Sequence, residues 1–263
     1  MREATTPLAG PTSLPCLPSP ASPSPGPGRE EHGAGGGTLG VYWRLRPAVP
    51  GAGGDWVDAI DLHDGRLAIC VGDAAGSDPR AAAFALRVRG LLCQALLAGR
   101  GPDAAVGGAV DVLAAGGDLG EMFATVFVAI ADPLTGEVVY VNAGHPPAIA
   151  LAAGASPRPL GPTGPILSDL FAGGRIWSSR SLVMAPGDRL ILCTDGVSEA
   201  RDAAGRGFGV DALSAADIRD AAPAEYLDEM AARVGAHAGG SALDDRTLAL
   251  LVRHGRHGRE AGG

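Results

Sequence analysis

The chain has 263 residues, of which 46% are hydrophobic, and carries a formal net charge of −8 at pH 7. A chain of this length holds one large domain or two small ones. The acidic balance argues against nucleic-acid binding, because phosphate backbones are bound through concentrated Lys and Arg. No apolar run reaches the roughly 18 residues that a membrane-spanning helix needs, so we expect no contact with a membrane.

The composition changes along the chain and divides it into three parts. Residues 1–38 are rich in Pro, Ser, Gly and Ala, and such a segment cannot bury enough apolar surface to fold. We therefore predict a disordered tail there. From 39 to 253 short apolar runs alternate with Gly, Pro and Asp, which predicts one globular domain. Residues 254–263 form a basic, glycine-broken end that we predict to be flexible.

The N-terminal segment and the cysteines indicate the cellular setting. Prolines interrupt the N-terminus throughout, so the charged start and apolar core of a signal peptide are missing. The four cysteines show no paired spacing. Three of them, Cys70, Cys93 and Cys193, lie in apolar runs, where a thiol acts as a small hydrophobe. We expect a cytoplasmic, reduced protein.

Apolar periodicity predicts more strands than helices. In chain order, we expect strands over 41–46, 56–62 and 67–71, helices over 81–98 and 103–114, strands over 122–131, 137–142 and 148–152, two strands within 175–193, a helix over 223–237 and a strand over 248–252. Asp64-Gly65, between the second and third strands, is a hairpin signal. Strands joined by short hairpins imply antiparallel sheets, and the helices must cover their outer faces.

Four aspartates lie where a polar turn meets an apolar strand. They are Asp55, Asp73, Asp195 and Asp244. A carboxylate at a strand end is held rigidly, and the neighbouring glycines allow the backbone to approach an ion or a phosphate closely. Hard divalent cations such as Mg²⁺ and Mn²⁺ prefer carboxylate, carbonyl and water oxygens. The sequence therefore predicts an oxygen-lined metal site.

Five short segments carry a family resemblance. In chain order they read GGDWVD at 53–58, VGDAAG at 71–76, NAGHPP at 142–147, TDGVSEA at 194–200 and DDRT at 244–247. Together they resemble the motifs of the PPM-type, metal-dependent serine/threonine protein phosphatases. The match is to the bacterial SpoIIE-like branch, which includes the stage II sporulation phosphatase and stress-response regulators of sigma factors. The resemblance covers about residues 39–253, which would form the phosphatase domain.

The resemblance implies an α+β fold, a four-layer α-β-β-α sandwich of two antiparallel sheets flanked by helices, with two Mn²⁺ or Mg²⁺ ions at one edge. Asp73 would bridge the ions, the Ala74 carbonyl would bind one of them, and Asp195 and Asp244 would complete the ligands of the other. Asp55 would act through a metal-bound water and, with Asp73, would be catalytic. Two close cations would lower the pKa of a shared water and orient the phosphate.

The resemblance also implies a cytoplasmic hydrolase that acts in signal transduction. Its substrate would be a phosphoserine or phosphothreonine on a bacterial regulatory protein of the anti-anti-sigma type, so the enzyme would take part in sigma factor regulation. Neither nucleic acid nor membrane would be a partner. The sequence leaves open whether the protein forms a homodimer.

Several assignments within these motifs have alternatives. Asp245 competes with Asp244 as the metal ligand, and we prefer Asp244 because the family pattern places the ligand first. For His145 we favour a strand-ending turn in which the imidazole caps backbone groups over a catalytic role. Arg44 and Arg46 are candidates for the phosphate-binding arginine of eukaryotic relatives.

One segment departs from the branch, which usually continues HGLPAA where this chain has Ser77-Asp78-Pro79-Arg80-Ala81-Ala82. If that turn needs φ > 0, Asp78 is costlier than glycine, and its charge would lie near the metals. The alternative to an active enzyme is therefore a weak or inactive relative that binds a partner. A plain metal-binding or structural domain is a third hypothesis. We expect Asp78 to be neutral, because the four principal carboxylates are retained together.

Overall fold

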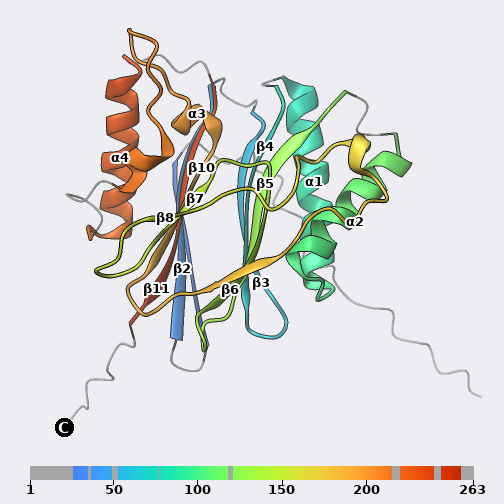
Figure 1. Ribbon diagram of the computed structural model, residues 1–263, viewed down its shortest axis with the longest axis horizontal. Coiled ribbons are helices and arrows are strands. Elements are labelled where there is room, and N and C mark those ends of the chain that lie inside the picture. Colours follow the sequence, from blue (N-terminus) through green and yellow to red (C-terminus); the bar gives the residue numbers. More distant parts are fainter. Residues whose placement is uncertain are drawn as a thin grey trace, which may run out of the picture.

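Two antiparallel sheets stack face to face in the computed structural model, and helices cover both outer sides (Figure 1). The structure describes residues 26–34, 37–48, 53–76, 78–117, 121–214, 220–239 and 244–255. This arrangement is the expected four-layer α-β-β-α sandwich, so the predicted fold class is confirmed.

Among the described residues, the first sheet has six strands and the second has five. The first sheet runs, in spatial order, β1 (Gly26–Ala34), β2 (Gly37–Arg46), β11 (Arg246–His254), β10 (Arg189–Cys193), β7 (Ala148–Leu151) and β8 (Arg158–Leu160). The second runs β3 (Asp55–Asp61), β4 (Leu67–Ala74), β5 (Ala124–Ala131), β6 (Glu137–Ala143) and β9 (Arg180–Val183). Every pair of neighbouring named strands is antiparallel, and short hairpins join β1 to β2, β3 to β4, β5 to β6 and β7 to β8.

The helices divide between the two outer faces (Figure 1). Helices α1 (Pro79–Leu97) and α2 (Pro102–Ala115) cover the second sheet, whereas α4 (Pro223–His237) covers the first. The shorter elements are α3 (Asp195–Ser198) and the 3₁₀ turns η1 (Asp169–Phe171) and η2 (Val210–Ser214). In the described part of the chain, no helix has both the length and the apolar character that crossing a membrane requires.

Three apolar layers hold these elements together. Between the sheets, Phe127 and Tyr140 stack with ring centroids 5.3 Å apart, and Leu251 packs into the same layer from β11. Val88 of α1 belongs to the layer beneath α1 and α2, and Met230 of α4 to the layer beneath α4. Because successive strand residues point to opposite faces, each buried strand contributes to two of these layers.

An ion pair adds a directional contact to the packing of α1. The Arg89 guanidinium donates two hydrogen bonds to the Asp58 carboxylate on β3, at 3.0 and 2.5 Å. Both side chains are mostly buried, at 15% and 19% exposure, so this bidentate pair is shielded better than a surface pair. It fixes α1 against the strand that begins at Asp55.

The structure corrects the expectation of a disordered segment over 1–38. Residues 26–34 form β1, which pairs along its whole length with β2, and Thr38 lies within β2. Composition did not predict this strand, because its hydrogen bonds are backbone bonds to the edge of β2. An open strand edge offers unpaired backbone groups to an extended segment whatever its side chains are. Residues 1–25, 35 and 36 lie outside the described residues. At the other end, His254 is the last residue of β11, and 256–263 lie outside the described part.

Asp78 is the N-cap of α1. Its φ of −97° is ordinary extended backbone, so the position does not require glycine, whereas Gly76, two residues earlier, has φ of +103°. The Asp78 Oδ1 atom accepts hydrogen bonds from the amides of Arg80 and Ala81, both at 2.9 Å. The carboxylate therefore satisfies free amides of the first helical turn.

We predict that the capping role decides how Asp78 tolerates substitution. Asp78→Ala removes the acceptor and should lower the free energy of unfolding by about 1 kcal/mol, while Asp78→Asn and Asp78→Gly should lower it by only a few tenths. Urea unfolding of the three variants beside the wild type measures these differences. Equal losses for alanine and asparagine would show that the cap does not stabilise α1.

Candidate metal centre

Asp55 and Asp73 face each other at one end of the second sheet. Asp55 is the first residue of β3, and the antiparallel register pairs it with Asp73 near the end of β4. Gly54 lies close to both the Asp73 carboxylate and the Ala74 carbonyl: a Cβ atom on Gly54 would lie 3.0 Å from Asp73 Oδ1 and closer still to the Ala74 oxygen. Only glycine therefore fits between the loop and these oxygens.

The Asp55 carboxylate joins the two sheets. Its Oδ2 atom accepts hydrogen bonds from the hydroxyls of Thr194 and Thr247, both at 2.7 Å. Thr194 follows β10 and Thr247 lies in β11, so both donors belong to the first sheet. The Thr247 amide also donates to the Thr194 hydroxyl oxygen, at 3.1 Å. Each threonine stands inside a quoted motif, but no sequence pattern predicted its contact with Asp55.

Asp195 and the Asp244-Asp245 pair reach the same edge from the first sheet. Asp195 opens α3 directly after β10, and Asp244-Asp245 directly precede β11. A Cβ atom on Gly196 would collide with the Asp245 carbonyl oxygen, so this glycine allows α3 to approach the other segment. The structure therefore brings all four predicted carboxylates to one edge of the sandwich.

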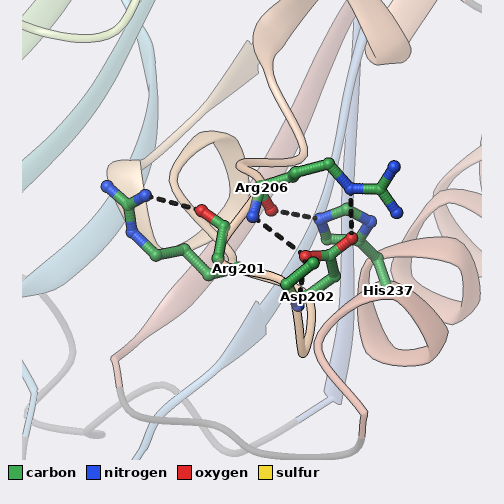
Figure 2. Close-up of polar contacts among 6 residues, drawn as sticks. Arg201, Asp202, Arg206 and His237 are labelled. Atoms are coloured by element: carbon green, nitrogen blue, oxygen red, sulfur yellow. Dashed lines mark hydrogen bonds and ion pairs between the residues drawn. The ribbon is translucent and has the colours of Figure 1, made fainter.

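A polar cluster fixes the loop that follows α3 (Figure 2). The Asp202 carboxylate accepts hydrogen bonds from the amides of Ala204 and Arg206, both at 2.9 Å. At the end of α4, His237 Nε2 lies 2.9 Å from the Arg206 carbonyl oxygen. The Arg201 guanidinium donates to the Gly205 carbonyl at 2.9 Å, which closes the loop. These contacts connect α4 to the segment that begins at Asp195.

Asp244 and Asp245 differ in their surroundings. Asp245 is only 3% exposed. Its Oδ1 accepts the Ala48 amide at 2.7 Å and its Oδ2 the Gly54 amide at 2.9 Å, so both oxygens are used to hold the loop before β3. Asp244 is exposed, and its Oδ1 accepts the Asp245 amide at 2.9 Å. This difference favours Asp244 as the carboxylate that meets a ligand.

The crowded carboxylates shift one another's pKa. Burial, followed by the charges of Asp195 and Asp244, raises the pKa of Asp73 to about 7. Burial and the charge of Asp73 raise the pKa of Asp55 well above its ordinary value, although the threonine hydroxyls act in the opposite direction. The pKa of Asp195 is raised by burial and by the nearby charges of Asp244 and Glu199. Without a cation, the Asp73 carboxyl group therefore keeps a proton up to near neutral pH.

These residues fit hydrated divalent cations. In the described part of the chain, no three carboxylate, imidazole or thiol groups converge closely enough to enclose an ion by themselves. Mg²⁺ keeps several waters and is usually held by one or two carboxylates. Asp73, the Ala74 carbonyl beside Gly54, and the neighbouring Asp195 and Asp244 supply such oxygens, and a cation would relieve the repulsion that raises their pKa values.

The two candidate arginines lie on one face of β2 but at different distances along it. The Arg44 guanidinium donates to Asp228 of α4 at 2.7 Å, so Arg44 points towards the helix layer. Arg46 ends β2, on the same face of the strand, and is paired in register with Arg246, which directly follows Asp245. The register therefore places Arg46, and not Arg44, at the end of the sheet where Asp244 and Asp245 lie.

A first prediction for the site concerns pH. Because the pKa of folded Asp73 is about 7 and that of an ordinary aspartate 3.8, the folded state binds more protons between these values. The free energy of unfolding of metal-free protein should therefore fall as pH rises from about 4 to about 7. Asp73→Asn should flatten this fall, and saturating Mg²⁺ should reduce it by holding the carboxylate ionised. Thermal unfolding in EDTA at pH 5 and 7.5 tests this prediction. An equal loss of stability between the two pH values for wild type and Asp73→Asn would contradict it.

A second prediction separates the two adjacent aspartates. Asp245→Ala leaves two backbone amides without their acceptor and should lower the free energy of unfolding by about 2–4 kcal/mol, whereas Asp244→Ala should cost about 1 kcal/mol or less. Urea unfolding in EDTA measures both. A larger loss for Asp244→Ala than for Asp245→Ala would reverse the assignment.

Known proteins match this chain over parts of their length. Protein IcfG of Synechocystis sp. is 33% identical over 135 residues, which are 51% of this chain and 21% of that protein. The crystal structure of the RsbU and RsbW domains of Rv1364c from Mycobacterium tuberculosis has a TM-score of 0.69 at 29% identity, covering 86% of this chain and 63% of that one. The chain thus spans about a fifth of the curated relative and under two thirds of this structure.

More distant structures share the fold alone. The SiaA-PP2C domain of Pseudomonas aeruginosa has a TM-score of 0.68 at 21% identity, covering 81% of this chain and 85% of that one.

The model of the family described as stage II sporulation protein E matches residues 63–254, a span that includes four of the five quoted motifs. The chain therefore belongs to the SpoIIE family and has the fold of PP2C-type phosphatase domains, as its motifs predicted.

Proposed function

We propose that this domain is a metal-dependent protein serine/threonine phosphatase, a hydrolase of phosphoserine or phosphothreonine esters. The observation that carries the proposal is the convergence of Asp73, Asp195 and Asp244, from three separate segments, beside the Ala74 carbonyl at one edge of a PP2C-type fold. Membership of the SpoIIE family supports the same reaction.

Each residue of the edge has a separate task in this proposal. Asp73 and the Ala74 carbonyl would hold the ions on the side of the second sheet, and Asp195 and Asp244 would hold them on the side of the first. Asp55, fixed by two threonine hydroxyls, keeps its register partner Asp73 in place and positions water at the edge. When bound, two divalent cations supply a water of lowered pKa and positive charge for the phosphate.

Two Mn²⁺ or Mg²⁺ ions are the cofactors we propose. The catalytic domain of PstP, a fold neighbour with a TM-score of 0.55 at 17% identity, was solved in complex with two manganese ions and matches 82% of this chain and 99% of that one. Oxygen donors of the kind gathered here do not distinguish Mn²⁺ from Mg²⁺, because both are hard cations.

The substrate we propose is a phosphorylated regulatory protein of the anti-anti-sigma type. This follows from the resemblance of the motifs to the SpoIIE-like branch and from the match to the RsbU and RsbW domains. The alternative, an inactive relative that binds such a partner, rested on Asp78. Since Asp78 caps α1 with ordinary backbone angles, that substitution has a structural explanation and the alternative loses its support.

Hydrolysis of a generic aryl phosphate tests the reaction. We expect turnover with Mn²⁺, loss of turnover with EDTA, and a fall in kcat of at least about 100-fold for Asp73→Ala, because one carboxylate would contact both ions. Asp64→Ala is the matched control: Asp64 lies in the turn of the same hairpin, at the end far from Asp73, and is half-exposed beside Arg66.

A phosphoserine-bearing protein of the anti-anti-sigma type then tests the substrate class. Turnover of Asp73→Ala within a few-fold of the wild type would contradict the proposed site. An inactive wild type at saturating Mn²⁺ would contradict the proposed function and restore the binding-module alternative.

A further inference from the structure

We propose that His145 is a positioning residue for the acidic edge, because its hydrogen bond to Thr125 holds the strand that lies beside Asp73. The inference rests on the proposed function, because it assigns His145 a part in holding the ion-binding carboxylates at their spacing. His145 belongs to the NAGHPP segment, the one quoted motif that the proposed site leaves without a role.

The turn that carries His145 is fixed by its own hydrogen bonds. Asn142, near the end of β6, accepts the His145 amide on Oδ1 at 2.8 Å and donates from Nδ2 to the Leu160 carbonyl at 3.2 Å. Gly144 has φ of +67°, a left-handed conformation that glycine adopts without strain. This turn directs the imidazole inwards, and His145 is only 1% exposed.

One side of the imidazole contacts the second sheet. His145 Nδ1 lies 2.8 Å from the Thr125 hydroxyl oxygen. Thr125 lies on β5, and the antiparallel register pairs it with Asp73 of β4. The imidazole is therefore one strand away from the carboxylate that we propose to contact both ions. The expected contact with backbone groups is replaced here by a bond to a side-chain hydroxyl.

The other side of the imidazole faces the first sheet. The imidazole lies near the backbone of Cys193, the last residue of β10, and Asp195 follows two residues later. Nε2 is buried and has no hydrogen-bond partner among the described residues, so it packs towards the first sheet without a hydrogen bond to it. The directional contact of His145 is therefore the one to Thr125, in the second sheet.

The chemistry of this environment excludes acid–base catalysis by His145. Burial lowers its pKa to about 3, so the imidazole is neutral at physiological pH. A neutral imidazole can pair with the Thr125 hydroxyl through Nδ1 either as donor or as acceptor, since a hydroxyl serves both roles. Groups that orient metal ligands without touching the metal typically change its affinity 10–100-fold when mutated.

The test compares variants that remove the Thr125–His145 hydrogen bond with a variant that keeps it. His145→Phe keeps an aromatic ring but removes both nitrogens, and Thr125→Val keeps the shape of threonine but removes the hydroxyl. Both should weaken Mn²⁺ binding, measured by calorimetry, about 10–100-fold, with a fall in kcat at subsaturating Mn²⁺ and little change in the KM for an aryl phosphate. Thr125→Ser restores the hydroxyl and should bind Mn²⁺ within about 2-fold of the wild type.

His63→Gln is the matched control, because His63 is exposed in the β3–β4 turn, at the opposite end of the strand that carries Asp73. If Thr125→Val and His145→Phe lower thermal stability but bind Mn²⁺ like the wild type, His145 is a packing residue and the inference is wrong. Should His145→Phe fail to fold, the Thr125→Val and Thr125→Ser pair decides. A wild type that binds Mn²⁺ without hydrolysis overturns the proposed function alone, and one that binds no Mn²⁺ overturns both.

Discussion

The hydrogen bonds from Thr194 and Thr247 to the Asp55 carboxylate hold the two sheets in register at their functional edge. A buried carboxylate is costly unless hydrogen bonds compensate for lost hydration, and here two hydroxyls from the opposite sheet offset part of that cost. Asp55 is also the register partner of Asp73. The contact that closes the sandwich at this end therefore also holds the strand that carries Asp73, whose carboxylate is crowded by those of Asp195 and Asp244.

Neighbouring residues of the same type have different tasks because strand geometry and burial separate them. Asp245 uses both oxygens on backbone amides, whereas the adjacent Asp244 remains exposed. Arg44 reaches Asp228 on α4 because it lies on the outer face of β2, and Arg46 shares that face. Whether an aspartate can bind an ion, or an arginine a phosphate, thus depends on its burial and on the face of the sheet on which its side chain lies.

The sequence predicted those elements whose signal is local. Helix α4 agrees with its predicted range of 223–237, and α1 and β4 agree in position, because apolar periodicity and glycine-bounded strand ends are visible in a short window. Strand β1 was missed because its pairing partner, not its composition, makes it a strand. The Thr247–Asp55 contact joins residues 192 positions apart, so no local pattern could reveal it, and the motifs gave a role to Asp55 but none to Thr247.

Asp78 shows how a departure from a family pattern is resolved by local geometry. In sequence, a carboxylate in place of glycine near the metal ligands suggests either backbone strain or an added charge. In the structure, φ is not positive and the carboxylate accepts two amides at the start of α1. The partial positive charge of a helix N-terminus stabilises that anion, so its charge is compensated by the helix that it starts. The proposed activity therefore rests on the four carboxylates at the strand ends, which lie together at one edge.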